Sequence, residues 1–430
     1  MKILFHPPFT DRETFADRYW RAVHYLGPAA ARISELVMLS DLPIPSAPPE
    51  YLDPTLPARE APLREKLNLA PANAAPPTCD MVIVWDQARA HDAPSAPETH
   101  VLDPAMLHEG DLWIELGARL APVAAQTRVE THRTLMAALT RARSEVVNLF
   151  GSGPSLASLD LGALASGVNV VCNSLIVNDG LMQRLKPGFI VAVDPIFHAG
   201  ASRHAGAFRK KLAAALRGGD ALFIAQERDA HIYHAALPED VRARVIPVPV
   251  RFGLEPNLDL ARRFQFTATR NVLTLAMLPL AAHLGGEVRC YGFDGRPEGE
   301  RETFWAYDPG SVLAPELAQQ RQAHPGFFTL DYQDYYALHC GTVAAWIARM
   351  EQRGVSVRAG SRSHIPAFGA RVMPSVAPAP TASSNFKREI ARAYARRQAQ
   401  AIYGAMLEAA WAPGWMKRTL RGAVAMARRF

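Results

Sequence analysis

From Glu145 onward, short apolar runs rich in β-branched residues alternate with stretches in which apolar residues recur at helical spacing. The clearest predicted helices are Ala207–Leu216, Asn271–Leu284 and Tyr335–Arg353. Strands separated by helices are typical of a mostly parallel, Rossmann-like sheet with helices on both faces. The pattern therefore predicts an α/β domain over residues 145–370, with strands at Val146–Phe150, Val168–Cys172, Phe189–Val193, Ala221–Ala225, Arg244–Val248, Glu287–Tyr291 and Val355–Arg358.

The first 140 residues repeat this pattern in a shorter form and predict a smaller α/β domain of unknown role. Apolar runs at Lys2–Phe5, Glu35–Leu39 and Asp80–Trp85 are expected to form strands, and Arg12–Tyr25 is expected to form a helix. Residues 43–77 contain too many prolines and alanines for a single regular element.

Composition narrows the class of protein. Of the 430 residues, 49% are hydrophobic and 20% are charged, as in globular proteins. The four cysteines lack metal-ligand spacing, the apolar run Val272–Leu284 is too short to span a bilayer, and Met1–His6 lacks the features of a signal peptide. We therefore expect a cytoplasmic protein without a nucleic-acid partner, and its net charge of +6 suggests an acidic partner.

The chain closes with a basic segment. After a linker rich in Pro, Ala and Ser at residues 374–385, residues 386–430 contain ten Lys or Arg against two Glu. Within this segment, Trp415–Phe430 can form a helix with cations beside an apolar stripe. Two interpretations stay open: a solvated helix packed on the body, or an amphipathic helix bound peripherally to an anionic surface at the inner face of the cytoplasmic membrane.

A loop with two glycines follows the first predicted strand of the larger domain. Its sequence is Gly151-Ser152-Gly153-Pro154-Ser155. Backbone amides in such a loop can surround a phosphate, and a side chain in place of Gly153 would then block the approach of the ligand. An ordinary strand-to-helix connection is an equal alternative, because the loop matches neither the Rossmann nor the Walker A motif.

Polar residues also follow three other predicted strands, at the edge where ligands bind in parallel sheets. They are Asn173-Ser174, Asp194 and Asp294. The Asn173 amide suits a sugar hydroxyl, a phosphate or a base edge, and Asp194 suits a ribose hydroxyl or a metal. Turn formation by Asn173 and helix capping by Asp194 are the alternatives.

The stretch DYYALHCG, from Asp334 to Gly341, places His339 after two tyrosines. Tyr336 and His339 are three residues apart, so they share one face of a predicted helix. A histidine with a pKa near neutrality is the usual general base for a hydroxyl, and a neighbouring phenol can donate to an anionic leaving group. A core histidine bonded to a backbone carbonyl is the alternative.

Six segments occur in a fixed order between Val146 and Ser361: GSGPSL, VVCNS, VAVDP, GEVRCYGFDG, FWAYD and YYALHCG. This order resembles that of bacterial CMP-sialic acid sialyltransferases. The related MptE-like domain of 6-hydroxymethylpterin diphosphokinases and motility-accessory glycosyltransferases shares the glycine–proline loop and the strand that ends in Asp-Pro. The resemblance implies a GT-A-like α/β fold without a metal-binding Asp-x-Asp sequence.

The resemblance also implies roles for the matched residues. The loop of Gly151, Gly153, Pro154 and Ser155, in which Ser152 replaces the usual Asn, would hold the cytidine nucleotide. Asn173 would contact the nucleotide near the departing phosphate, with Ser174 beside it. Asp194 stands where the sialyltransferases have Asn and the MptE-like domain has Asp.

The remaining matches concern catalysis and the phosphate of CMP. His339 falls on the catalytic base and Tyr336 on a phosphate-binding tyrosine. Trp305 replaces a second such tyrosine, and Arg296, two residues beyond Asp294, stands near a third. Asn271 ends Thr269-Arg270-Asn271, which takes the place of a Thr-Ser-Gly turn before a long helix.

The implied function is that of a metal-independent glycosyltransferase without a cofactor. A CMP-activated sialic acid, Kdo or related ulosonic acid would move onto a hydroxyl of a cell-surface glycan or glycolipid, as in lipopolysaccharide or capsule biosynthesis. Two alternatives come from other classes: an MptE-like pyrophosphokinase that uses ATP and Mg²⁺, and a non-catalytic scaffold of polysaccharide assembly.

Overall fold

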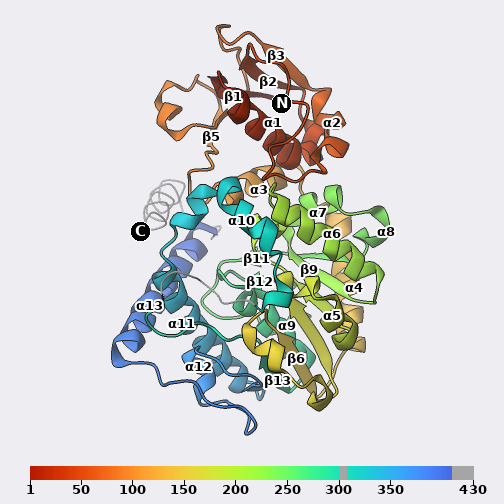
Figure 1. Cartoon of the computed structure of the whole chain (residues 1–430), viewed down its shortest axis with the longest axis vertical. Coiled ribbons are helices and arrows are strands. Elements are labelled where there is room, and N and C mark those ends of the chain that lie inside the picture. The colour runs from red at the N-terminus through yellow and green to blue at the C-terminus, as the bar shows by residue number, and fades with distance from the viewer. Residues whose placement is uncertain (301–307, 409–430) are drawn as a thin grey trace.

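The computed structural model describes residues 1–300 and 308–408 (Figure 1). The chain has an α/β fold with two sheets, one of seven strands and one of five, in which all the paired neighbours run parallel. This confirms the fold class expected from the alternation of apolar runs and helical stretches. Trp305 and Trp415–Phe430 lie outside the described residues, so the roles expected of them stay predictions.

The larger sheet has the strand order β10-β9-β8-β7-β6-β13-β14, which is consistent with a Rossmann-like layout. Three of its seven predicted strands match the structure residue for residue, and the other four differ by one or two residues at their ends. The strands are β6 (Val146–Phe150), β7 (Val168–Cys172), β8 (Phe189–Val191), β9 (Leu222–Gln226), β10 (Val245–Val248), β13 (Glu287–Tyr291) and β14 (Ser356–Ala359).

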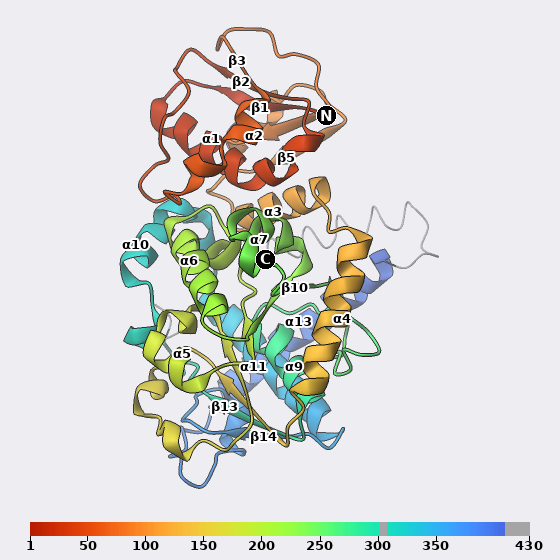
Figure 2. The same ribbon diagram turned by 90° about the vertical axis from the view of Figure 1, so that its right-hand side faces the viewer.

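Helices cover both faces of this sheet because successive strand residues point to opposite sides. On one face, Leu149 of β6 belongs to a hydrophobic cluster with side chains of α4, α9 and α11. On the other face, Phe150 belongs to a cluster with side chains of α6 (Figure 2). These helices are α4 (Ala125–Arg141), α6 (Arg203–Arg217), α9 (Leu278–Leu284) and α11 (Tyr332–Glu351).

The smaller sheet has the order β3-β2-β1-β4-β5. Its three inner strands were expected from their apolar runs, whereas its two edge strands are short, are not fully buried and lack a clear pattern. The strands are β1 (Lys2–Phe9), β2 (Glu35–Ser40), β3 (Leu67–Ala70), β4 (Met81–Val84) and β5 (Glu98–Val101), and the helices against them include α1 (Arg12–Leu26) and α3 (Glu109–Leu120).

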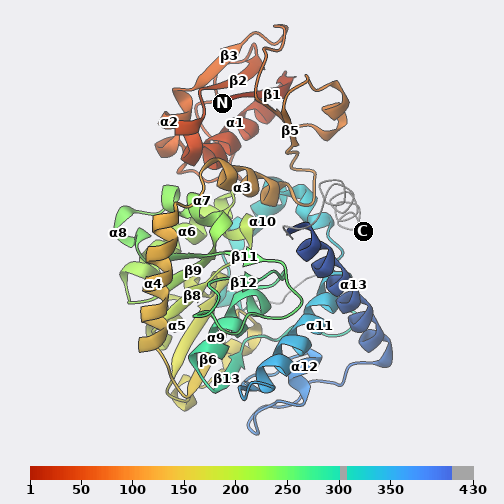
Figure 3. The ribbon, with the colours of Figure 1, turned by 180° about the vertical axis from the view of Figure 1, so that it is seen from behind.

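Further elements surround the two sheets. Helix α13 packs along α11, as Figure 3 shows from behind. Within the described residues, no helix combines the length and the apolar character needed to cross a membrane. The further elements are α2 (Ala61–Arg64), α5 (Asp179–Leu185), α7 (Ala230–Ala236), α8 (Glu239–Arg242), α10 (Ala314–Ala323), α12 (Pro366–Gly369), α13 (Ser384–Glu408), and the parallel pair β11 (Val250–Arg251) and β12 (Phe266–Thr267).

Buried charges join the smaller sheet to the larger one. Arg21 of α1 donates to Glu109 of α3 (3.3 Å), and Glu109 also lies 3.0 Å from Nδ1 of His324. Arg209 of α6 donates to Asp53 at 2.7 Å. We call these five residues the seam. Each is at most 3% exposed, so the two parts of the chain meet through paired charges in a closed interior.

Candidate functional site

The order of the strands along the larger sheet reverses between β6 and β13. From β6 the chain adds β7, β8, β9 and β10 on one side, and it then returns to place β13 on the other side. In open parallel sheets, ligands bind beside the carboxyl ends of the strands at such a reversal. The loops after β6, β7, β8 and β13 carry the predicted polar residues, so these loops gather at this edge.

The glycine loop lies directly against the loop after β13. The Gly153 amide donates to the Gly292 carbonyl at 2.9 Å, and the Ser155 amide donates to the Asp294 carboxylate at 2.7 Å. A Cβ atom on Gly153 would lie 2.6 Å from the Gly292 oxygen and 2.7 Å from Cγ of Asp294. The glycines therefore allow two loops to meet, and the space that was expected to admit a ligand beside Gly153 is filled by protein.

The other loop residues fit this connecting role. The Ser152 carbonyl accepts from the Asp308 amide at 2.7 Å, and a Cβ atom on Gly151 would also meet the Gly292 oxygen, at 2.5 Å. Pro154 is exposed at the start of a short 3-10 turn. Burial raises the pKa of Asp294, while its bonds from Ser155 lower it. In this structure the Ser155 amide and hydroxyl donate to Asp294, and the nucleotide-binding roles expected of both residues stay predictions.

Asn173 keeps the features of a ligand-binding residue. Its φ of 51° places it in the left-handed region, which asparagine adopts more readily than most residues. Its Oδ1 atom is buried and has no hydrogen-bond partner among the described residues. Ser174 is 8% exposed and lies beneath it in the turn after β7. A buried acceptor without a donor is costly, so Asn173 is suited to receive an N–H or O–H group from a ligand.

Asp194 begins the loop after β8. Its carboxylate accepts from the Phe197 amide at 3.4 Å and caps a π-helical turn, Pro195–Ala199. This is the capping role that was weighed as the alternative. Burial and the nearby Asp111 carboxylate raise the pKa of Asp194 to about 7. The group can therefore exchange a proton near neutral pH.

Tyr336 and Arg296 lie in the interior and bind each other. The Tyr336 hydroxyl accepts from the Arg296 amide at 3.1 Å, and the Arg296 guanidinium lies 4.8 Å from the centre of the Tyr336 ring. Arg296 also donates to the carbonyl of Tyr332 and the side chain of Gln333, both at 2.9 Å. Tyr336 is 1% exposed and Arg296 is 2% exposed. Both residues position the start of α11 and neither lines the cavity described next, and their expected contacts with the CMP phosphate stay predictions.

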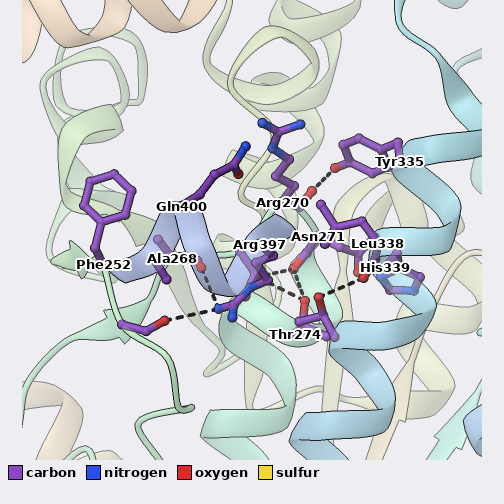
Figure 4. Close-up of a pocket in the computed structure, with 14 residues that line it drawn as sticks. Phe252, Ala268, Arg270, Asn271, Thr274, Tyr335, Leu338, His339, Arg397 and Gln400 are labelled. Carbon is purple, nitrogen blue, oxygen red and sulfur yellow. Dashed lines mark hydrogen bonds between the residues drawn. The ribbon is translucent and has the colours of Figure 1, made fainter. Parts of the chain in front are cut away.

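A cavity of about 160 Å³ lies between the first turns of α11, the segment before α9 and helix α13 (Figure 4). Asn271 and His339 line it, as do Thr269 and Thr274. Hydrogen bonds hold the polar side of the cavity in place, since the Asn271 side chain accepts from the Leu273 amide at 2.9 Å and Thr274 donates to Thr269 at 3.0 Å. Two predicted site residues that lie far apart in the chain are thereby brought together.

His339 is 4% exposed where it borders the cavity. Burial lowers the pKa of His339 to about 3, so the imidazole is neutral at physiological pH. Tyr335, its neighbour one turn earlier, lines the cavity where Tyr336 does not, and it donates to the Arg270 carbonyl. Burial, and to a smaller extent the charge of Asp194, raises the pKa of Tyr335, so its hydroxyl stays protonated at neutral pH.

The cavity also contains Arg397, which the sequence did not single out. This residue comes from α13 and is 7% exposed. Its Nη2 atom donates to the carbonyls of Gly253 (3.4 Å) and Ala268 (3.2 Å), and its guanidinium lies 4.5 Å from the centre of the Trp346 ring. Arg397 is one of several arginines in a basic segment, and nothing in the sequence distinguishes it as the buried one.

Comparisons with known proteins give no relative. No family model, curated protein or solved structure matches the chain.

Proposed function

We propose that the protein is a glycosyltransferase that moves a CMP-activated ulosonic acid onto a glycan hydroxyl. His339 would take the proton of the acceptor hydroxyl while the oxygen of that hydroxyl attacks the anomeric carbon. The bond from this carbon to the phosphate oxygen of CMP would break, and CMP would leave with the bonding electrons. The order of motifs that resembles the sialyltransferases supplies the choice of CMP.

One observation carries the proposal. His339, which is buried, lines the cavity between α11, the segment before α9 and α13, and Asn271, another predicted site residue, lines the same cavity. A neutral imidazole is the form that accepts a proton, and burial keeps His339 in that form. A pKa of about 3 is far below that of an efficient base, so the proposal requires that a bound substrate raise it. At the carboxyl edge of the larger sheet, Asn173 is the residue best suited to contact the nucleotide, because its amide oxygen is buried and has no hydrogen-bond partner among the described residues.

In this proposal the acceptor and the donor nucleotide bind at two different places. A general base contacts the group that it deprotonates, so the acceptor would occupy the cavity beside His339. The donor nucleotide would lie along the strand ends at Asn173 and Asp194. The glycine loop would contribute indirectly, by tying β6 to β13 beneath the nucleotide.

Nucleotide binding and turnover test the proposal together. CMP added without metal is expected to raise the melting temperature of the full chain. His339→Ala should keep this shift but release CMP from CMP-sialic acid or CMP-Kdo about 10²- to 10⁴-fold more slowly, the usual contribution of a positioned base. His283→Ala is the matched control, because His283 lies on α9 and does not line the cavity.

Other results would redirect the assignment. Stabilisation by ATP with Mg²⁺ but not by CMP would favour a pyrophosphokinase. Stabilisation by neither nucleotide would favour a scaffold. Near-parental turnover in His339→Ala would make His339 a structural residue and remove the main support for the proposal.

A further inference from the structure

The Arg397 guanidinium is a buried charge without a counter-charge. It forms no ion pair with any residue that the structure describes, and its Nη1 atom is buried without a hydrogen-bond partner there. None of the described residues that line the cavity is Asp or Glu. An uncompensated charge in a protein interior is strongly unfavourable, so such a group calls for a partner from outside the chain.

The guanidinium is held in a defined orientation. Trp346 lies against its face, and Nη2 donates to the carbonyls of Gly253 and Ala268, two residues in the wall of the cavity. Trp346 is fixed in turn by a bond from its indole N–H to the Thr274 carbonyl at 2.8 Å. A cation whose position is set before the ligand arrives loses little freedom on binding. Figure 4 shows Arg397 between Asn271 and Thr274 on one side and Gln400 on the other.

The approach of α13 to α11 depends on a glycine. A Cβ atom on Gly341 would lie 2.9 Å from Cβ of Tyr394, which is one turn before Arg397. The same contact is supported at its rim by an ion pair between Arg396 and Asp334. The sequence therefore places a small residue in α11 where it lets α13 bring Arg397 to the cavity.

We infer that this cavity binds a carboxylate carried by the acceptor, with Arg397 as its counter-ion. The charge favours a monoanion over a phosphate dianion, because Arg397 is the one buried cation among the described residues that line the cavity, whereas Arg270, which also lines it, is exposed (Figure 4). The hydroxyls of Thr269 and Thr274 and the amide of Gln400 offer further polar groups around it. The acceptor would then be an acidic sugar such as a uronic acid.

The assignment to the acceptor rests on the proposed function, in which His339 deprotonates a hydroxyl in the same cavity. The binding of a carboxylate does not rest on it. Burial lowers the pKa values of both Arg397 and His339. A carboxylate in the cavity would raise both and would stabilise the imidazolium that forms during transfer. The carboxylate of an acidic acceptor would thus stabilise the protonated His339 that forms when the acceptor hydroxyl loses its proton.

Calorimetric titration of the full chain with glucuronate, and with glucose as the neutral match, tests the inference. We expect glucuronate to bind and glucose to bind at least about tenfold more weakly, since the hydrogen bond to a charged group is lost. Arg397→Gln should weaken glucuronate binding about 10- to 100-fold. Arg392→Gln, which removes an exposed arginine of the same helix, should leave it unchanged. Arg397→Lys keeps the charge without the planar fork, so it should weaken binding less than Arg397→Gln.

The outcomes separate the inference from the proposed function. Equal binding of glucose and glucuronate, or unchanged glucuronate binding in Arg397→Gln and Arg397→Lys, would overturn the inference. Tighter binding of inorganic phosphate than of glucuronate would overturn the choice of a carboxylate. Arg397-dependent binding of glucuronate in a protein that does not turn over CMP-sugars would support the carboxylate site and contradict the transferase. Transfer from CMP-sugars to acidic and neutral acceptors at equal rates would support the transferase and contradict the carboxylate site.

Discussion

Arg209 in the seam and Arg397 in the cavity are both buried arginines, but their surroundings differ. Arg209 is 3% exposed and donates to the Asp53 carboxylate and to the carbonyls of His198 and Gly200. Arg397 is 7% exposed and bonds to two carbonyls, and it forms no ion pair with a described carboxylate. A buried arginine that is paired with a carboxylate stabilises one arrangement of the chain. A buried arginine without such a partner, beside a cavity, favours the binding of an anionic ligand.

The largest expected effect on the free energy of unfolding comes from breaking the ion pair of Asp53 with Arg209 in the seam. Asp53→Asn removes the charge that faces both Arg209 and Arg59 while keeping the volume of the side chain. Because a buried cation is left uncompensated, we expect the free energy of unfolding to fall by about 3–5 kcal/mol. Urea denaturation at pH 7 measures it. The matched control is Asp240→Asn, which breaks an exposed pair with Arg217 and should cost less than about 1 kcal/mol. Equal losses in the two variants would show that burial does not distinguish them.

A smaller effect on the free energy of unfolding should follow from the lowered pKa of His339. The pKa of His339 is about 3 in the folded protein and near its usual 6.5 after unfolding, so the unfolded chain binds more protons below pH 6.5. Stability from a neutral His339 is therefore present above pH 6.5 and is lost as the pH falls. Between pH 7 and pH 5 the parent should lose about 2 kcal/mol more than His339→Gln. Parallel denaturation curves at both pH values check this, and an identical pH dependence would contradict it.

The smallest effect is expected for Arg397 itself, and it should have the opposite sign to that of the seam. Arg397→Met removes an uncompensated charge and keeps much of the apolar contact with Trp346. The free energy of unfolding should stay within about 1 kcal/mol of the parent or rise. Chemical denaturation without added ligand measures it. A loss as large as that of Asp53→Asn would mean that Arg397 is a structural residue and that the comparison between the two arginines fails.

Much of the larger sheet could be predicted from the sequence. β6 and β7 are mostly apolar runs, and β13 buries Val288, Cys290 and Tyr291 between a glycine pair and a polar loop, so each has the features of a buried parallel strand. The two edge strands of the smaller sheet, β3 and β5, were not predicted. Strands with partly exposed side chains have no continuous apolar run to reveal them.

The site was predicted only in part, because helix rotation and packing decide which side chains face a cavity. Asn271 and His339 line the cavity, but Tyr335 lies there in place of its neighbour Tyr336. Adjacent helical residues point about 100° apart, so a small change in where the helix packs exchanges their roles. Arg396 and Arg397 present the same problem, since only the contact of α13 with α11 turns the second one inward.

Helix α13 follows both sheets in the chain, and this has a consequence for the order of events during synthesis. Domains fold largely as units while the chain emerges, with earlier segments first. The strands that carry Asn173 and Asp194, and the helix that carries His339, are all translated before Arg397 leaves the ribosome. A nascent chain could therefore complete its sheets and still lack the cation of the cavity. The protein would thus become able to bind an acidic ligand only at the end of synthesis, when α13 packs against the folded α/β part.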